Sequence, residues 1–412
     1  MTHAASAHPT INLDDYVPLL GAAEIDDLRA LAKGLAGRSV QMINSTAVGG
    51  GVAEILNRLI PLLSELGLCP RWDVLTGGND FFAITKAFHN ALHGEPYEAR
   101  PKDFDTFLSY NEQNRQRFDF NAEFTVIHDP QPVALIDARP PGTNHWIWRC
   151  HIDLSRPNPQ VWEFLRPYVC GYDSALFSSP EFAQRLPIPQ YQFFPCIDPL
   201  SEKNHDLAPE FITQTLERFG IDRARPILTQ ISRFDRLKDP LGVLRAYQIV
   251  KRYTDCQLVL AGGGASDDPE GETVLAEVRG LADGDPDVHV LDLPPWSALE
   301  INALQRASTV IIQKSLREGF GLTVTEALWK KKPVVASAVG GIPAQVIHKH
   351  TGLLTHSIEG TAYQIRFLLA HPTLARTLGE HGYEHVREHF LITSNVRRYL
   401  ALFRHLSCAS AL

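Results

Sequence analysis

Short apolar segments alternate with amphipathic stretches along almost the whole chain, and this alternation restricts the fold more than any other feature. The apolar segments are near-continuous hydrophobic runs, as parallel strands buried on both faces require. They are residues 39–44, 124–129, 145–152, 174–179, 226–232, 257–262, 288–293, 309–313 and 333–337. Stretches with helical periodicity separate most of them. The pattern predicts an α/β fold made of doubly wound parallel sheets.

The rhythm is interrupted once, between about residues 185 and 222, where the chain is irregular and rich in proline. Strand–helix alternation starts again at Pro226. We therefore predict an N-terminal α/β domain over 1–205 and a second α/β domain over 206–385. Residues 386–412 are expected to carry a C-terminal helix, for which packing back on the N-terminal domain and packing on the second domain are the alternatives. A length of 412 residues agrees with two or three domains.

Charge and hydropathy exclude several classes of partner. The net charge is −8, and the longest block of like charge is the three lysines 330–332, which we expect at the solvated end of a helix. Nucleic acids and anionic membranes need clustered cations, so neither is expected as a partner. No apolar run is long enough to span a membrane, and the N-terminus lacks the basic and apolar regions of a signal peptide. The six scattered cysteines show no C-x-x-C pair, which favours a reduced cytoplasmic protein without a metal site.

Three consecutive glycines, residues 49–51, follow the first predicted strand and precede an amphipathic helix. Glycines at a helix N-terminus let backbone N–H groups approach an anion, and the helix dipole adds attraction. Gly50 and Gly51 are therefore candidates for contact with a phosphate. A tight turn without a ligand is the alternative. The loop matches neither the P-loop nor the G-x-G-x-x-G fingerprint, which disfavours a nucleotide hydrolase and a nicotinamide enzyme.

Polar residues follow two other predicted strands. His128 ends the strand at 124–129, and His151 and Asp153 follow the strand that starts at 145. Open α/β sheets bind ligands at the carboxyl ends of their strands, so these side chains are candidates for a substrate site. A histidine satisfied by the backbone is the alternative for His128, and a helix N-cap is the alternative for Asp153.

Two cations stand just past the first strand of the second domain. Arg233 and Lys238 are five residues apart in QISRFDRLKDP. A diphosphate suits this pair, because an arginine binds phosphate through two parallel hydrogen bonds and a lysine adds a point charge. The alternative is surface charge neutralised by Asp235 and Asp239.

The stretch SLREGFGLTVTE, residues 315–326, places two carboxylates around a Gly-Phe-Gly turn after a buried strand. We expect Glu326 in the first turn of the following helix, where it accepts hydrogen bonds from sugar or ribose hydroxyls. Phe320 is expected to be exposed. The N–H groups of Phe320, Gly321 and Leu322 are expected to meet further hydroxyls or a phosphate.

Each glutamate of this stretch also has a structural explanation. Ser315 with Glu318 reads S-x-x-E, and Thr323 with Glu326 reads T-x-x-E, which are capping-box patterns. The two glutamates could therefore be helix caps.

The motif E-G-F-G-L-x-x-x-E, Glu318–Glu326, is similar to the E-x7-E motif of retaining GT-B glycosyltransferases of the glycogen-synthase and sucrose-synthase kind. The downstream PVVASAVGGIPAQV resembles the next unit of the same proteins. In the N-terminal half, INSTAVGGGVAEIL, FFAITKAFHNALHG, WRCHIDLS and CIDPLSEKN resemble the trehalose glycosyltransferring synthases of glycosyltransferase family 4. Trehalose phosphorylases are relatives of that family. The resemblance runs from about residue 40 to the end.

This resemblance implies a GT-B fold, with two Rossmann-like domains facing across a cleft. The implied activity is reversible transfer of glucose from an NDP-glucose to free glucose, giving α,α-1,1-trehalose with retention. The implied catalytic residues are His128, Arg233, Lys238 and Glu318. The implied donor-binding residues are Gly50, Gly51, Arg233, Lys238, Glu318, Phe320, Gly321, Leu322 and Glu326, of which Arg233 and Lys238 hold the diphosphate and Glu326 the ribose. Asp153 and His151 are implied on the acceptor side.

The implied substrates are a nucleotide sugar, glucose and trehalose, with no tightly bound cofactor. Mg²⁺ is compatible with a sugar diphosphate, but no residue pattern predicts it. The oligomeric state stays open, with a homodimer as one alternative. A trehalose phosphorylase that uses phosphate and glucose-1-phosphate, or another retaining GT-B hexosyltransferase, is the nearest alternative function. A Rossmann-type oxidoreductase and a non-catalytic sugar-nucleotide sensor are more distant ones.

Overall fold

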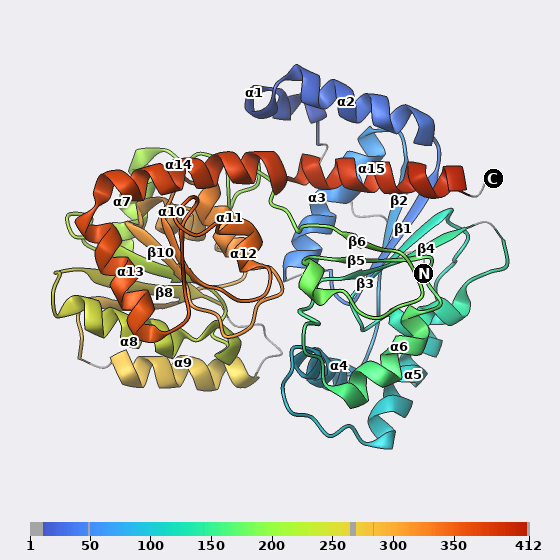
Figure 1. Cartoon of the computed structure of the whole chain (residues 1–412), viewed down its shortest axis with the longest axis horizontal. Coiled ribbons are helices and arrows are strands. Elements are labelled where there is room, and N and C mark those ends of the chain that lie inside the picture. Colours follow the sequence, from blue (N-terminus) through green and yellow to red (C-terminus); the bar gives the residue numbers. More distant parts are fainter. Residues whose placement is uncertain (1–10, 48–49, 143, 264–268, 283, 410–412) are drawn as a thin grey trace. The chain divides into compact units, whose positions relative to one another are not determined.

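The computed structural model of the chain describes residues 11–47, 50–142, 144–263, 269–282 and 284–409, which form two compact units (Figure 1). Unit 1 comprises Met1–Cys196 together with Ile392–Leu412, and unit 2 comprises Ile197–Leu391. Each unit has its own six-stranded sheet, and every strand pairing is parallel. The predicted α/β class with two Rossmann-like domains is therefore confirmed.

Unit 1 contains a sheet of order β2-β1-β3-β4-β5-β6. Its strands are β1 (Ser39–Asn44), β2 (Cys69–Val74), β3 (Phe124–His128), β4 (His145–Cys150), β5 (Ser174–Phe177) and β6 (Gln190–Gln192). Its α-helices are α1 (Val17–Leu20), α2 (Ala22–Ala32), α3 (Gly51–Glu65), α4 (Asn79–Leu92), α5 (Pro101–Arg115), α6 (Pro159–Val169) and α15 (Ile392–Ala409). Short 3-10 helices are η1 (Leu13–Tyr16), η2 (Lys33–Leu35), η3 (Val133–Ala138) and η4 (Pro180–Phe182).

Unit 2 contains a sheet of order β12-β11-β10-β7-β8-β9. Its strands are β7 (Ile227–Ile231), β8 (Gln257–Gly262), β9 (Val288–Asp292), β10 (Val310–Gln313), β11 (Val334–Ser337) and β12 (Leu353–Thr355). Its helices are α7 (Pro209–Arg218), η5 (Arg236–Lys238), α8 (Pro240–Lys251), α9 (Pro269–Ala282), α10 (Ala298–Ala307), α11 (Leu322–Trp329), α12 (Ile342–Gln345), α13 (Ile358–Ala370) and α14 (Pro372–His389).

The apolar runs form these strands because both faces of each sheet are covered. Successive residues of a strand point to opposite faces. In unit 2, Leu258 and Leu260 of β8 belong to one hydrophobic cluster, whereas Val259 and Ala261 belong to another. Both sets are buried, so β8 has no polar face. None of the helices built from the described residues has the length and hydrophobicity that crossing a membrane requires.

The last helix, α15, follows unit 2 in the sequence but packs in unit 1. Phe403 stacks on Phe124 of β3 with ring centroids 4.4 Å apart. Tyr399 meets Phe193 edge to face at 5.3 Å. Arg397 forms an ion pair of 2.8 Å with Glu24 of α2. The chain therefore crosses between the units twice, after Cys196 and after Leu391.

We predict that Phe403→Ala destabilises unit 1 by about 3–5 kcal/mol, because it removes a fully buried aromatic ring from the contact of α15 with β3. Tyr363→Ala is the control, since Tyr363 is 64% exposed on α13, and we expect it to change stability by about 0.5 kcal/mol or less. Urea unfolding measures the loss, and hydrogen exchange locates it. Equal losses in the two variants, or loss of protection confined to unit 2, would contradict the assignment of α15 to unit 1.

Candidate active site

The strand order of each sheet identifies one pair of adjacent strands from which the chain continues in opposite directions, and ligands commonly bind at such a position. In unit 2, β10 returns to lie beside β7 after the chain has passed through β8 and β9, so the connections after β7 and β10 run in opposite directions. In unit 1 the corresponding pair is β1 and β3. Ligands of open α/β sheets bind outside the carboxyl ends of such strands. The predicted residues at these four strand ends are Gly50 and Gly51 after β1, His128 in β3, Arg233 and Lys238 after β7, and Glu318 after β10.

Lys238 and Glu318 form an ion pair in unit 2. The distance from Nζ of Lys238 to Oε2 of Glu318 is 2.5 Å, and the side chains are 20% and 8% exposed. Ser315 Oγ donates a hydrogen bond of 3.1 Å to the same carboxylate oxygen. The N–H of Leu316 donates to the carbonyl of Leu237 at 2.7 Å, which joins the two connections. The structure therefore brings together two predicted residues that are 80 positions apart.

Arg233 lies beside this pair in the sequence but is more accessible. Its side chain is 45% exposed and forms an ion pair of 3.1 Å with Asp235, whose other oxygen accepts from the N–H of Leu237 and caps η5. Pairing of Arg233 with Asp235 was the alternative to a phosphate role, and the structure contains that pair. The second half of that alternative is wrong, because Asp239 pairs with Lys314 rather than with Lys238.

Asp239 has a left-handed backbone conformation, with φ of 48°. It is the residue between η5 and α8, so the connection after β7 turns into α8 at this position. Its Oδ1 accepts a hydrogen bond of 2.9 Å from the N–H of Gly242, which caps α8. Gln230 Nε2 donates to the carbonyl of Lys238 at 2.8 Å. The backbone on both sides of the lysine is thus held, so Lys238 is presented from a fixed connection.

Glu326 is buried in α11, with 3% exposure. Gln305 Nε2 of α10 donates to its Oε2 at 3.3 Å. The expectation that Glu326 lies in the first turn is wrong, because α11 begins at Leu322 and Glu326 is its fifth residue. The N–H groups of Leu322 and Thr323, at the start of α11, lie in the first turn, where the helix itself supplies no carbonyl partner, whereas the N–H of Val324 donates to the carbonyl of Gly321 at 2.9 Å.

Neither glutamate is a helix cap. Gly321, with φ of 85°, precedes α11 without a side-chain cap. The Thr323–Glu326 capping box therefore does not form. Ser315 and Glu318 do interact, but through their side chains and outside any helix. The capping-box explanation for both glutamates is contradicted.

Close backbone packing shapes the turn between the two glutamates. A Cβ on Gly340, whose φ is 54°, would lie 1.6 Å from the carbonyl oxygen of Glu318. A Cβ on Gly341 would lie 2.6 Å from the carbonyl oxygen of Gly319. The glycines after β11 therefore let this connection lie directly on the backbone of the turn, which holds Glu318 in place.

Phe320 is buried rather than exposed, which corrects the sequence expectation. It is 4% exposed, and its ring meets Phe390 edge to face at 5.5 Å. Its carbonyl oxygen accepts a hydrogen bond from Nε2 of Gln345. The side chain of Phe320 therefore anchors the turn, and any contact with a ligand is left to its backbone.

The three lysines after α11 are also not a uniformly solvated helix end. Lys330 is 6% exposed, and burial lowers its pKa to about 7. Burial lowers the pKa of Lys332 to about 8. Lys331 alone is exposed, with its ammonium over the ring of Tyr383 at 4.7 Å. Patterns of like charge do not reveal which member of a run turns inward.

In unit 1, His128 and His151 form a hydrogen-bonded pair of imidazoles. His128 Nδ1 lies 3.1 Å from His151 Nε2, and the rings are stacked at 15°. Burial, with a smaller effect of the nearby Arg149 cation, lowers the pKa of His128 to about 3 and that of His151 well below its usual value. Both rings are therefore neutral at pH 7. His128 Nε2 is buried without a hydrogen-bond partner, so it is available to a ligand group that reaches it.

Asp129 holds the backbone of His151, Arg149 places a positive charge near both rings, and sequence analysis missed both residues. Asp129 has φ of 67°, and its Oδ1 accepts from the N–H of His151 at 2.7 Å. Burial raises the pKa of Asp129 to about 6. Arg149 is buried in β4 and donates to the carbonyl of Phe193 at 2.6 Å. The only sequence signal was their position next to the predicted histidines.

The remaining predicted residues of unit 1 stand as follows. Gly50, with φ of 83°, is the N-cap of α3, and Gly51 is the first helical residue, whereas Gly49 lies outside the described residues. Asp153 is buried, and its Oδ1 accepts from the N–H of Ser155 at 2.9 Å. Asp153 is not the N-cap of α6, because Asn158 caps that helix.

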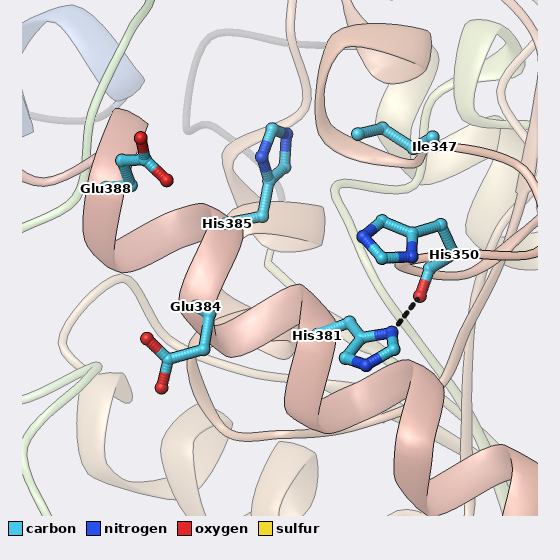
Figure 2. A pocket seen from close by; sticks show the side chains of 6 residues that line it. All are labelled: Ile347, His350, His381, Glu384, His385 and Glu388. Atoms are coloured by element: carbon cyan, nitrogen blue, oxygen red, sulfur yellow. Dashed lines mark hydrogen bonds between the residues drawn. The ribbon is translucent and has the colours of Figure 1, made fainter.

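A histidine-rich pocket of about 180 Å³ lies elsewhere in unit 2 (Figure 2). Its lining residues are Ile347, His350, His381, Glu384, His385 and Glu388. Backbone carbonyls already engage two of its imidazoles: His381 Nδ1 bonds to the oxygen of His350 at 3.2 Å, and His385 Nε2 bonds to that of Ala344 at 2.9 Å. Within the described part of the chain, no group of three or more His, Cys, Asp or Glu residues is arranged to hold a metal ion.

Two family models match the chain in succession. "Trehalose synthase, N-terminal domain" matches residues 42–184, and "Glycosyl transferases group 1" matches residues 212–385. The trehalose synthase of Pyrococcus horikoshii is 43% identical over 404 residues, which cover 96% of each protein. The trehalose synthase of Rubrobacter xylanophilus is also 43% identical, over 96% of this chain and 97% of that protein. The trehalose phosphorylase of Pleurotus pulmonarius is 28% identical over 96% of this chain but 61% of its own length.

Solved structures with the same architecture share the fold at low identity. The sucrose-phosphate synthase of Thermosynechococcus elongatus matches 90% of this chain and all of its own, with a TM-score of 0.71 and 19% identity. An α,α-trehalose-phosphate synthase (UDP-forming) from Burkholderia xenovorans, solved with glucose-6-phosphate, matches 90% of this chain with a TM-score of 0.69 and 16% identity. These likenesses show that the chain has the GT-B fold.

We predict that His128 makes the protein sensitive to acid. Its folded pKa of about 3 lies below the unfolded value of about 6.5, so the unfolded chain binds the proton first as the pH falls. Its contribution to stability is therefore complete above pH 6.5 and is lost towards pH 3, by up to about 1.4 kcal/mol per pH unit. His128→Gln should give a shallower fall in the free energy of unfolding between pH 7 and pH 5.

Urea unfolding at several pH values measures this slope. His356→Gln is the control, since His356 is exposed, and it should keep the slope of the unmodified protein. Equal slopes for the protein and for His128→Gln would show that His128 does not stay neutral in the folded state.

Proposed function

The chain belongs to the trehalose synthase family of glycosyltransferases, and we propose that it moves glucose from an NDP-glucose to free glucose, forming α,α-1,1-trehalose with retention. The observation that carries the proposal is the Lys238–Glu318 ion pair at the carboxyl ends of β7 and β10, within a chain 43% identical to trehalose synthases. The reaction is proposed to run in both directions.

The proposed donor site lies in unit 2. The diphosphate contacts Lys238 and Arg233, and the N–H groups at the start of α11 supply further donors. Only one of the three ammonium protons of Lys238 is needed for Glu318, so two remain for phosphate oxygens. Glu318 accepts from hydroxyls of the donor glucose, and Glu326 accepts from the ribose. The exposure of Arg233 suits a side chain that must be able to reach a ligand.

In unit 1 we assign uncharged groups, namely imidazoles and backbone N–H groups, to contacts with the substrates. His128 offers its unpartnered Nε2 to a hydroxyl of the donor glucose. Gly50 and Gly51, at the N-terminus of α3, approach the phosphate and the sugars. Asp153 and His151 are assigned to the acceptor glucose. Because His128 and His151 are neutral at pH 7, they bind and orient hydroxyls rather than add charge to the site.

The chemical step breaks the bond between the anomeric carbon and the β-phosphate oxygen. Negative charge grows on the departing diphosphate, and Lys238 and Arg233 stabilise it. The hydroxyl oxygen of the acceptor glucose attacks the anomeric carbon on the same face, and its proton passes to the departing phosphate oxygen. The products are trehalose and the nucleoside diphosphate. Glu318 is not the nucleophile in this scheme, since Lys238 and Ser315 both engage one of its oxygens.

A product assay tests the proposal. The protein is incubated with glucose and ADP-, UDP- or GDP-glucose, and in parallel with glucose and glucose-1-phosphate. We expect trehalose and a free nucleoside diphosphate, at least in part in the presence of EDTA. Release of phosphate from glucose-1-phosphate with formation of trehalose would instead identify a phosphorylase. Formation of another disaccharide, or of none, would overturn the proposed substrates.

Loss of the phosphate-binding cations tests the site separately. Lys238→Ala or Arg233→Ala should lower the transfer rate by about 10² to 10³, the usual scale for removing a group that stabilises developing charge. Arg245→Ala is the control, because Arg245 is an exposed cation of α8, and its rate should be unchanged. Near-normal turnover in Lys238→Ala and Arg233→Ala would remove them from the donor site.

A further inference from the structure

Lys330 ends α11, the helix that carries Glu326, and its ammonium is buried. Nζ donates to Asn204 Oδ1 at 3.1 Å and to the backbone carbonyl of Glu326 at 3.2 Å. The residue is 6% exposed, in contrast to its exposed neighbour Lys331. A charge is expensive to bury unless it is paired and hydrogen-bonded, so this placement calls for an explanation.

The partner of Lys330 is itself held in one orientation. Asn204 Nδ2 donates to the carbonyl of Asp198 at 3.0 Å, which leaves its Oδ1 to accept from Lys330. Arg306 of α10 donates to the carbonyl of Asn204 at 3.0 Å. The segment after the first crossing between the units therefore forms a fixed acceptor for the lysine.

Charged groups around Lys330 have opposite effects on its pKa. Burial and the cations Arg306 and Lys203 lower its pKa, whereas Glu326 raises it. Arg306 is offset by an ion pair of 2.9 Å with Asp206. Glu326 is thus the carboxylate that favours the charged form of Lys330.

We propose that Lys330 is a positioning residue for Glu326: it holds the end of α11 in place and keeps a positive charge near the buried carboxylate, which accepts from the two ribose hydroxyls of the nucleotide. The inference rests on the proposed function, because it assigns Glu326 to the ribose. Lys330 itself touches no substrate in this scheme. Gln305 of α10 donates to Oε2 of Glu326, and Lys330 donates to the backbone carbonyl of the same residue.

The test compares nucleotides with and without ribose hydroxyls. Calorimetry measures the affinity of the unmodified protein, of Lys330→Met and of Lys331→Met for ADP, UDP and GDP and for the 2′,3′-dideoxy form of the tightest binder. We expect Lys330→Met to weaken binding of the ribonucleotide by about 10-fold, the scale of one hydrogen bond to a charged group. Its affinity for the dideoxynucleotide should stay within about 2-fold, and Lys331→Met should match the unmodified protein.

A pH series on the unmodified protein gives a second measurement that does not depend on the variant folding. Since the ammonium of Lys330 loses its proton as the pH rises through about 7, the preference for ribonucleotide over dideoxynucleotide should decline between pH 6 and pH 9. In Lys330→Met this decline should be absent, because the variant has no ammonium at this position to lose its proton.

Three results would overturn the inference. Equal losses for both nucleotides would mean that Lys330 supports the fold alone, and unchanged affinity for both would mean that it does not act on Glu326. A preference that is constant with pH in the unmodified protein would also count against it. If the unmodified protein binds none of the three nucleoside diphosphates, the proposed function fails instead, and the two failures are distinct.

Discussion

The burial of both faces of each parallel sheet is the constraint on which the rest of this structure depends. A sheet without a polar face has few places for polar chemistry, because charged residues cannot stand along β7 or β8 without losing their water. The carboxyl ends of the strands are the exception, since the chain turns there and exposes backbone N–H groups at helix starts. Lys238 and Glu318 meet at such a place in unit 2. In unit 1, His128 ends β3 and Gly50 follows the neighbouring strand β1. The topology thus limits where a ligand can bind before any side chain is considered.

The two units place different electrostatics at these positions. In unit 2 the cations Arg233, Lys238 and Lys314 each face a carboxylate. In unit 1 burial keeps His128 and His151 uncharged, and their mutual hydrogen bond fixes how the rings lie. Charged groups suit a diphosphate, whereas neutral imidazoles suit hydroxyls, which both donate and accept. This difference agrees with the proposed roles of Arg233 and Lys238 at the diphosphate and of His128 and His151 at sugar hydroxyls.

The sequence predicts all inner strands of the two sheets and one edge strand, β9, but it misses the other edge strands. The unpredicted strands β2, β6 and β12 are all edge strands. β2 carries Pro70, Arg71 and Asp73 and is only partly buried, so it shows no apolar run. The candidate site residues were predicted from their position after buried strands, but the sequence did not predict their surroundings. The burial of Phe320 depends on Phe390, and that of Lys330 on Asn204, and neither partner is near in sequence. Contacts between residues so far apart leave no recognisable pattern in the local sequence.

The pairing of each cation with a carboxylate bears on how a reversible transferase would handle its nucleotide. Three uncompensated cations at one site would hold a released diphosphate tightly, and the release of product would then be slow. Asp235, Glu318 and Asp239 instead pair with Arg233, Lys238 and Lys314, so each pair is close to neutral before a ligand arrives. Binding then depends on directed contacts, from the remaining protons of Lys238 and from backbone N–H groups, more than on net charge. Such contacts strengthen as charge develops on the leaving oxygen, which is where stabilisation accelerates the reaction rather than merely retaining the product.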